Sequence, residues 1–238
     1  MPEERQRLSK VVAAAVPCSR REAEQYIAEG WVRVDGERVQ QPQSQVAPMQ
    51  RVQIDPQARL QPALQATVLL HKPAGMDNRA AQAQFGAATH WEGDTSGIRP
   101  VKSHGVGLMP LMELPPQASG LAVFSQDRRI VRKLTEDAAL LEQELIADVT
   151  GAIAANGLER LRRGLLRQGK PMPPAHVSWQ SEARLRIAAK GIAPEWIEWM
   201  CGQVGLQLTA LKRIRIGRIP MAGLPAGRWR YLPAGQRF

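Results

Sequence analysis

The sequence has little of what a disulfide-stapled or metal-binding protein needs. Its 238 residues include only two cysteines, Cys18 and Cys201, and four scattered histidines. The cysteines lie in unrelated contexts without Cys-x-x-Cys or Cys/His ligand spacing, which favours two free thiols over a disulfide or a zinc site. The sequence also lacks a glycine-rich loop of the phosphate-binding kind. We therefore expect no metal and no cofactor.

Long apolar runs and acidic residues are also scarce. No stretch is apolar enough to cross a membrane or to resemble a secretory signal, so we expect a cytoplasmic protein without a membrane partner. Asp and Glu number 22 against 32 Lys and Arg, which gives a formal net charge of +10. A polyanion is then the leading partner, because Lys and Arg gain affinity by displacing condensed counterions from phosphates. The alternative is a basic protein with no such partner.

The first 55 residues carry the clearest local signals. Apolar residues recur at helical spacing from Leu8, and Pro17 ends that helix. Ser19 and Glu22 then fit a capping box, in which each side chain satisfies a backbone amide at the start of a second helix. Farther on, Asp35-Gly36 is a favoured two-residue hairpin turn between short strands. The segment is predicted to fold as two helices followed by a small sheet.

This order of elements, with the residues from Arg7 to Asp55, resembles the RNA-binding domain named after ribosomal protein S four, which has an alpha-L arrangement. The resemblance implies that the second helix and the hairpin face RNA. Arg20 and Arg21 also occupy the first turn of a helix, where free amides and the helix dipole favour an anion. The alternative for any single Arg is a solvated helix face. The residues expected to meet RNA phosphates are Arg7, Lys10, Arg20, Arg21, Arg33 and Arg38.

A polar segment with two prolines, residues 56–66, predicts a linker between a domain at residues 1–55 and a larger one at residues 67–238. The larger domain opens on a short apolar strand that leads into Lys72-Pro73-Ala74-Gly75. This string is similar to the Lys-Pro-x-Gly motif that opens the catalytic domain of RNA pseudouridine synthases. Two roles are open for Lys72, a structural one and a contact with RNA.

The central motif resembles the same family and departs from it at the reactive position. Ser119-Gly120-Leu121 matches the motif of RNA pseudouridine synthases of the RsuA/RluF type, in which an Arg-Leu-Asp triplet precedes Thr-Ser-Gly-Leu. Counted back from this match, Glu113 stands in place of the Arg and Pro115 in place of the catalytic Asp. Proline has no nucleophile, no titratable group and no backbone donor, so it cannot perform that carboxylate's chemistry. A second similar string, Gly93 to Ile98, lacks the family spacing and is predicted to be a loop.

Two further positions depart from the family in a chemically consistent way. Leu145 stands where the resemblance implies a Tyr that stacks on the flipped base, and leucine offers no aromatic platform. Glu198 stands where the family has the Arg that pairs with the catalytic Asp. A Glu opposite an Asp would raise the pKa of that Asp, whereas a proline removes the conflict. The resemblance implies an α+β fold: a small alpha-L domain, then a mixed, mostly antiparallel sheet flanked by helices.

The leading hypothesis is a monomeric RNA-binding protein on a pseudouridine synthase scaffold that lacks catalysis and acts on ribosomal RNA or an assembling ribosomal particle. The main rival is an active uridine-to-pseudouridine isomerase that uses another carboxylate. Glu113 is its best candidate, because positions 113 and 115 of an extended segment face the same side. A third hypothesis is an interaction scaffold, in which exposed Trp196 and Trp199 recruit a protein partner. Packing of both tryptophans in the core is the alternative to that role.

Overall fold

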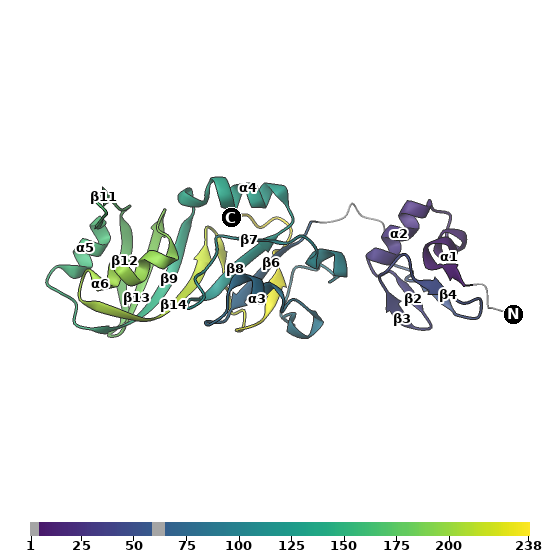
Figure 1. Ribbon diagram of the computed structural model, residues 1–238, viewed down its shortest axis with the longest axis horizontal. Coiled ribbons are helices and arrows are strands. Elements are labelled where there is room, and N and C mark those ends of the chain that lie inside the picture. The colour runs from purple at the N-terminus through teal and green to yellow at the C-terminus, as the bar shows by residue number, and fades with distance from the viewer. Residues whose placement is uncertain (1–4, 59–64) are drawn as a thin grey trace. The chain divides into compact units, whose positions relative to one another are not determined.

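The computed structural model describes residues 5–58 and 65–238. The chain forms two compact units (Figure 1). The first comprises Met1–Gln65 with Arg99–Gly107, and the second comprises Ala66–Ile98 with Leu108–Phe238. Residues 59–64 of the predicted linker lie outside the described residues.

The first unit begins with two helices, as the apolar spacing predicts. Ser19 starts the second helix through both bonds of the predicted capping box: its N–H donates to Glu22 at 2.7 Å, and its hydroxyl accepts from the Glu22 N–H at 3.2 Å. Asp35 and Gly36 have φ of +52° and +86°, as the predicted hairpin turn requires. One sheet has the order β3-β2-β5, and β1 pairs with β4. The elements are β1 (Gln6–Arg7), α1 (Leu8–Ala15), α2 (Arg20–Ala28), β2 (Val32–Val34), β3 (Glu37–Val39), β4 (Gln45–Val46) and β5 (Val52–Ile54).

A segment from far along the chain completes this first unit. Arg99–Gly107, which sequence reasoning assigned to the larger domain, contains the short turn η2 (Lys102–Gly105). Arg99 donates a hydrogen bond to the Gly30 carbonyl, and its guanidinium carbon lies 4.3 Å from the ring centroid of Trp31. These contacts explain why the segment packs with the first unit. A cation over an indole face is favourable, and neither partner is near the other in sequence.

The second unit is built on a nine-stranded sheet of order β12-β13-β9-β14-β8-β6-β16, with β15 on β14 and β7 on β8. All of its described strand pairs are antiparallel except β14 with β8. The predicted α+β fold with a mixed, mostly antiparallel sheet is therefore confirmed. The strands are β6 (Thr67–Lys72), β7 (Met109–Leu111), β8 (Ser119–Ser125), β9 (Glu142–Gly151), β12 (Ala175–Ser181), β13 (Arg184–Lys190), β14 (Leu206–Ile216), β15 (Ile219–Pro220) and β16 (Trp229–Tyr231).

Strands β6 and β8 are buried on both faces, because helices cover the sheet from two sides. Successive residues of a strand point to opposite faces. Accordingly, Leu69 packs with Leu134 of α4, whereas Val68 and Phe124 pack with Ala81 of α3. Figure 1 shows α4 and α3 on opposite sides of these strands. The remaining elements are α3 (Asn78–Gln82), η1 (Ala87–Thr89), α4 (Arg128–Glu136), η3 (Ala138–Leu140), α5 (Gly157–Arg163), β10 (Leu166–Arg167), β11 (Lys170–Pro171), η4 (Pro194–Trp196) and α6 (Ile197–Gly202).

The string from Gly93 to Ile98 forms a loop, as predicted, and its carboxylate is structural. Asp94 accepts hydrogen bonds from the Ser96 N–H at 2.8 Å and the Tyr231 N–H at 2.9 Å, and its carboxylate lies 2.8 Å from the His90 ring. Burial alone would raise the pKa of Asp94, but these hydrogen bonds outweigh burial and lower it. The loop is thus tied to β16 by a buried carboxylate.

Candidate functional site

Lys72 holds the loop that carries the altered motif. Its side chain is fully buried. The ammonium lies 2.6 Å from the Met76 carbonyl oxygen and 2.7 Å from that of Ala118, with those of Pro73 and Pro116 at 3.2 and 3.3 Å. All three ammonium hydrogens therefore have backbone acceptors. This geometry favours the structural role for Lys72 over a contact with RNA.

The glycine of the Ser-Gly-Leu triplet also has a structural reason. Gly120 has a φ of +108°, a backbone conformation that side-chain-bearing residues rarely adopt. Strand β14 runs parallel to β8 here, with Arg213 opposite Gly120. A Cβ on Gly120 would lie 2.2 Å from the Arg213 carbonyl oxygen, so only glycine fits. This close approach brings Arg213 against the motif.

The Arg213 guanidinium is the central polar group of the second unit. It is fully buried, and it donates from Nε to the Leu121 carbonyl and from Nη1 to Gln143 Oε1, both at 2.8 Å. Its Nη2 is buried without a hydrogen-bond partner among the described residues. Burial lowers the pKa of Arg213 to about 9, opposed by the nearby Glu195 carboxylate, so the group stays protonated at neutral pH. Sequence reasoning did not single out Arg213, because its bond to Leu121 joins residues 92 apart.

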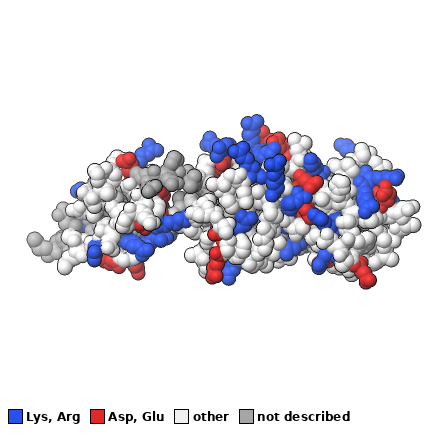
Figure 2. Space-filling view, turned by 180° about the vertical axis from the view of Figure 1, so that it is seen from behind, with Lys and Arg blue, Asp and Glu red and all other residues white. Residues whose placement is uncertain are grey.

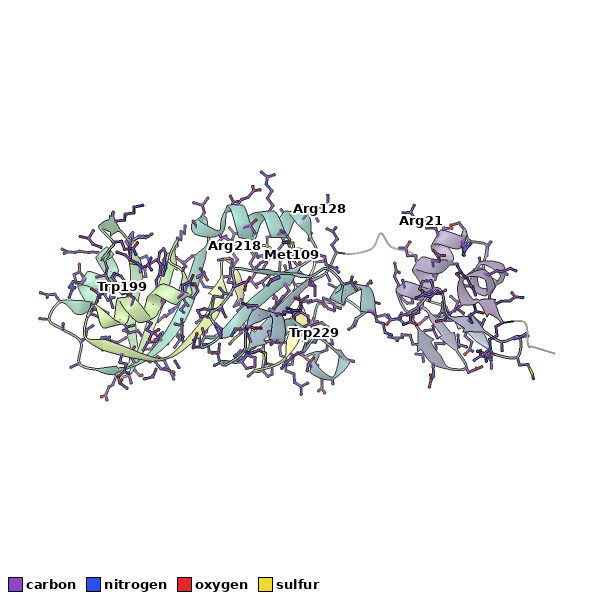
Figure 3. All side chains as sticks on the ribbon, viewed as in Figure 1. Arg21, Met109, Arg128, Trp199, Arg218 and Trp229 are labelled. Atoms are coloured by element: carbon purple, nitrogen blue, oxygen red, sulfur yellow. The ribbon has the colours of Figure 1, made fainter. Side chains whose placement is uncertain are left out.

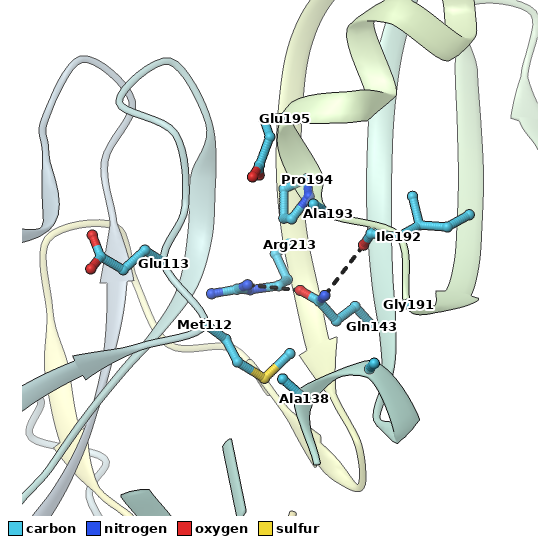
Figure 4. A pocket seen from close by; sticks show the side chains of 11 residues that line it. Met112, Glu113, Ala138, Gln143, Gly191, Ile192, Ala193, Pro194, Glu195 and Arg213 are labelled. Carbon is cyan, nitrogen blue, oxygen red and sulfur yellow. Dashed lines mark hydrogen bonds between the residues drawn. The ribbon is translucent and has the colours of Figure 1, made fainter. Parts of the chain in front are cut away.

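A pocket of about 340 Å³ opens over Arg213 (Figure 4). Most of its wall is apolar or small, whereas its four polar side chains come from four different segments of the chain. Figure 4 shows the Nη2 end of Arg213 directed toward the space between Glu113 and Glu195. The lining residues are Met112, Glu113, Ala138, Ala139, Gln143, Gly191, Ile192, Ala193, Pro194, Glu195 and Arg213.

The two glutamates of the pocket differ in their surroundings. Glu113 accepts a hydrogen bond from Asn78 Nδ2 at 2.8 Å, which anchors its carboxylate at one edge. Glu195 lies on η4 across the pocket, and its side chain is exposed. In Figure 4 it extends toward the space above Arg213. Among the described residues, no carboxylate lies within the 4.0 Å of Arg213 that would define an ion pair. The pocket therefore has a cation at its floor and a separate anion at its rim.

Known proteins resemble this chain over almost its whole length. The model of the S4 domain matches residues 6–52. The dual-specificity RNA pseudouridine synthase RluF of Escherichia coli (strain K12) is 26% identical over 234 residues, which cover 98% of this chain and 77% of that protein. Over almost its whole length the chain is therefore similar to RNA pseudouridine synthases. An uncharacterized RNA pseudouridine synthase of Aquifex aeolicus (strain VF5) is 26% identical over 97% of this chain and 91% of its own length. The crystal structure of a pseudouridylate synthase shares the fold, with a TM-score of 0.59, 18% identity and 95% of each chain covered.

The positions that depart from the pseudouridine synthase motifs do not all meet in the pocket. Pro115 is half-buried in the turn before β8, where its carbonyl accepts from the Ala118 N–H at 3.0 Å. Leu145 is buried in the core of the second unit, and Glu198 is exposed on α6. Of these four residues, only Glu113 lines the pocket, where Glu195 lies as well.

In this chain, the S4 domain exposes the six basic residues that were predicted from the sequence. They are Arg7, Lys10, Arg20, Arg21, Arg33 and Arg38. Figure 3 shows Arg21 extending outward from α2. Arg33 and Arg38 are direct cross-strand partners on the hairpin. Burial lowers the pKa of Arg99, as do the charges of Arg38 and Arg33, whereas the Asp55 and Glu29 carboxylates oppose this shift. The hairpin itself therefore presents two guanidinium groups.

A second basic surface lies on the other unit. Figure 2 shows Lys and Arg side chains gathered along the edge that carries α4. Three of its cations are already paired: Arg129 with Asp127 at 3.1 Å, Arg132 with Glu136 at 2.8 Å and Lys133 with Asp137 at 2.9 Å. These exposed pairs reduce the attraction of α4 for an external anion.

The tryptophans of the scaffold hypothesis are half-buried. Trp196 and Trp199 both pack against the core of the second unit. The Arg167 guanidinium carbon lies 4.7 Å from the ring centroid of Trp196. This packing favours the alternative of a core role for the two rings.

In the part of the chain that the structure describes, no group of three or more His, Cys, Asp or Glu side chains could hold a metal ion. Both cysteines are free, Cys18 half-buried and Cys201 buried. Within residues 5–58 and 65–238, no helix has the length and apolar character to cross a membrane.

Proposed function

We propose that this protein binds ribosomal RNA and does not isomerise uridine. The observation that carries the proposal is Pro115 at the position of the family's catalytic Asp, within a motif whose Gly120 and supporting Lys72 are kept for structural reasons. A side chain without a nucleophile or a titratable group cannot perform covalent or acid-base chemistry on a uridine.

RNA as the partner is supported by the S4 domain and by the names of the relatives. RluF is named as an RNA pseudouridine synthase, and a relative from Bacillus subtilis (strain 168) as a ribosomal large subunit pseudouridine synthase. Arg33 and Arg38 face each other across the hairpin, an arrangement that costs free energy unless an anion lies between them. A backbone phosphate is such an anion, and Arg binds it in a fork geometry.

Loss of catalysis is supported by the chemistry of three positions taken together. Pro115 offers no carboxylate, Leu145 offers no ring on which a flipped uracil could stack, and Glu198 offers no cation to pair with a catalytic Asp. We therefore place the protein among the pseudoenzymes of ribosome assembly. We also propose a cytoplasmic location and a monomeric state, which rest on sequence expectations alone.

The rival function is an active isomerase in which Glu113 supplies the carboxylate. Its support is that Glu113 lines the pocket over Arg213. Asn78 holds that carboxylate in place through a hydrogen bond. A mechanism in which Glu113 reacts would have to break this hydrogen bond or keep it throughout the reaction. Glu113→Gln keeps the shape and removes the charge, so an isomerase that depends on Glu113 would lose its activity in this variant.

Tritium release from RNA labelled at carbon five of uridine tests the proposal, because isomerisation exchanges that hydrogen. Binding of the same RNA is measured in parallel by fluorescence anisotropy. We expect saturable binding without release. Tritium release that depends on the protein would contradict the proposal. If the Glu113→Gln variant then released no tritium, an isomerase that depends on Glu113 would be supported instead.

A further inference from the structure

The pocket over Arg213 holds an incomplete polar arrangement. Arg213 is fully buried and protonated, yet its Nη2 has no hydrogen-bond partner among the described residues. A buried donor left unpaired is unfavourable, and more so when the group is charged. The Nε and Nη1 nitrogens of Arg213 donate to the Leu121 carbonyl and to the Gln143 amide oxygen. A ligand that supplied an acceptor at Nη2 would give the remaining nitrogen a partner.

The opposite side of the pocket offers an acceptor. Glu195 acts on the charge of Arg213 from across the pocket without forming an ion pair with it. Ile192, Pro194 and Met112 form apolar walls between them. A flat ring therefore fits the arrangement best, with an acceptor at one end of its edge and N–H donors at the other.

Met112 adds a sign of strain at the same wall. Its backbone has a φ of +46°, in the left-handed region that a residue with a long side chain seldom adopts. Such conformations are unfavourable and concentrate at ligand sites. The strained residue and the unpaired Arg213 nitrogen belong to the same 340 Å³ pocket.

The charges of the pocket discriminate between the groups of an RNA. A phosphate would meet Arg213 but would be repelled by Glu195 and by Glu113 at the rim. Uracil presents a single N–H between two carbonyl oxygens, whose lone pairs repel a carboxylate that approaches that N–H. Guanine presents a carbonyl oxygen followed by two adjacent N–H donors, on N1 and on the exocyclic amine. Guanine therefore matches the order of a cation followed by a carboxylate.

We propose that this pocket binds an unpaired guanine base, with the guanine carbonyl oxygen on Arg213 Nη2 and its two N–H donors on the Glu195 carboxylate. The inference rests on the proposed function, since it takes the base from a bound RNA. It assigns the pocket a base that the isomerase reaction of the family does not use, and it gives Glu195 the role of selecting that base.

The test uses the full chain and short single-stranded RNAs of one length that differ only in the central base, which is guanine, hypoxanthine or uracil. Fluorescence anisotropy measures each affinity. We expect the guanine RNA to bind at least about 10-fold more tightly than the uracil RNA. Uracil cannot make the two hydrogen bonds that guanine donates to the charged Glu195 carboxylate. Hypoxanthine lacks the exocyclic amine and is expected to fall between them. Equal binding of the guanine and uracil RNAs would overturn the proposal.

Two variants and a control test whether the preference for guanine arises in the pocket. Glu195→Gln is expected to reduce the guanine preference about 10-fold, because one carboxylate oxygen becomes a donor. Ala139→Leu adds bulk at an exposed lining position and is expected to remove the preference by filling the pocket. Glu182→Gln makes the same charge change at an exposed residue outside the pocket and should leave the preference intact.

The outcomes separate this inference from the proposed function. If all three RNAs bind equally and no tritium is released, the protein is a non-catalytic RNA binder and the guanine assignment is wrong. A preference that survives both Glu195→Gln and Ala139→Leu would overturn the assignment too. If none of the RNAs and no ribosomal RNA binds, both the assignment and the proposed function fail.

Discussion

Single residues explain why the frame of a pseudouridine synthase persists around an altered motif. Gly120 is required by the close approach of β14, and Lys72 is required by the carbonyls of the motif loop. Both residues support the backbone of the loop. They therefore stay necessary even though Pro115 replaces the catalytic Asp of the family. The Glu113 side chain, by contrast, is held by one hydrogen bond from Asn78 at the edge of the pocket.

Replacing Lys72 with Met separates its two possible roles. The variant leaves buried carbonyls such as those of Met76 and Ala118 without their donor, so we expect a loss of about 2–4 kcal/mol in the free energy of unfolding. Urea denaturation measures this loss. Unchanged stability together with weaker RNA binding would instead support a direct contact between Lys72 and RNA.

Gly120→Ala is expected to destabilise the second unit by about 2–4 kcal/mol, because the new Cβ meets the backbone of Arg213 and φ is positive. Gly223→Ala is the matched control, since Gly223 has a φ of +76° with open space around it. The control isolates the backbone strain, for which we expect about 1 kcal/mol. Thermal unfolding measures the loss of stability in each variant. Equal losses would show that the close approach of β14 does not add to the cost of the substitution at Gly120.

At the scale of elements, the β2–β3 hairpin and the loop at residues 93–98 carry charges in contrasting surroundings. The β2–β3 hairpin presents Arg33 beside Arg38. The loop at residues 93–98 is fixed to β16 through Asp94. Under the proposed function, the hairpin binds an external anion, whereas the Asp94 carboxylate is bound by groups of the protein itself. We therefore expect salt to change RNA binding by the hairpin and pH to change the stability that the loop contributes.

The hairpin prediction concerns the salt dependence of RNA binding. Arg33→Gln is expected to weaken binding of all RNA sequences alike and to reduce the slope of log affinity against log salt by about 1. Arg132→Gln is the control, because Arg132 is exposed on α4 but already paired with Glu136. Anisotropy titrations at several salt concentrations measure both slopes. An unchanged slope for Arg33→Gln would remove the hairpin from the RNA surface.

The loop prediction concerns acid. The pKa of Asp94 is lower in the folded state than in the unfolded chain, because hydrogen bonds from Tyr231, Ser96 and His90 outweigh the burial that would raise it. Its stabilising contribution is therefore complete above the unfolded pKa of about 3.9 and is lost as the pH falls through the lower folded value.

Asp94→Asn should cost about 1–2 kcal/mol at neutral pH, since hydrogen bonds to a charged acceptor are replaced by weaker ones. The difference from the natural protein should shrink as the pH is lowered below about 4. Urea denaturation at pH 7 and pH 3 gives both values. A cost that is the same at both pH values would mean that the ionised form of Asp94 is not what stabilises the loop.

At the scale of the whole molecule, local signals predicted the order of elements well. The capping box of Ser19, the turn at Asp35-Gly36 and the loop at residues 93–98 depend on neighbours in sequence, and each formed as expected. Successive side chains of β6 and β8 point to opposite faces of the sheet, as strand geometry alone requires. These features could be predicted because their causes lie within a few residues.

Long-range pairings account for what the sequence did not reveal. The burial of Arg213 and its unpaired nitrogen arise where β14 meets β8. Arg99 joins the first unit through contacts with Gly30 and Trp31 that no local pattern encodes. The same limit applies to the pocket, where Glu195 rather than Glu198 faces Arg213. Residue types at matched positions therefore revealed the resemblance to pseudouridine synthases but not the geometry of the pocket.

The most direct measurement is tritium release from carbon five of uridine in ribosomal RNA, with the protein in excess over RNA and occupancy confirmed in the same sample. RluF from Escherichia coli serves as the positive control on its own labelled substrate. We predict full occupancy and no release above the protein-free rate, because Pro115 supplies no carboxylate. Stoichiometric release by this protein would contradict the account and would show that another group, with Glu113 first among them, performs the chemistry.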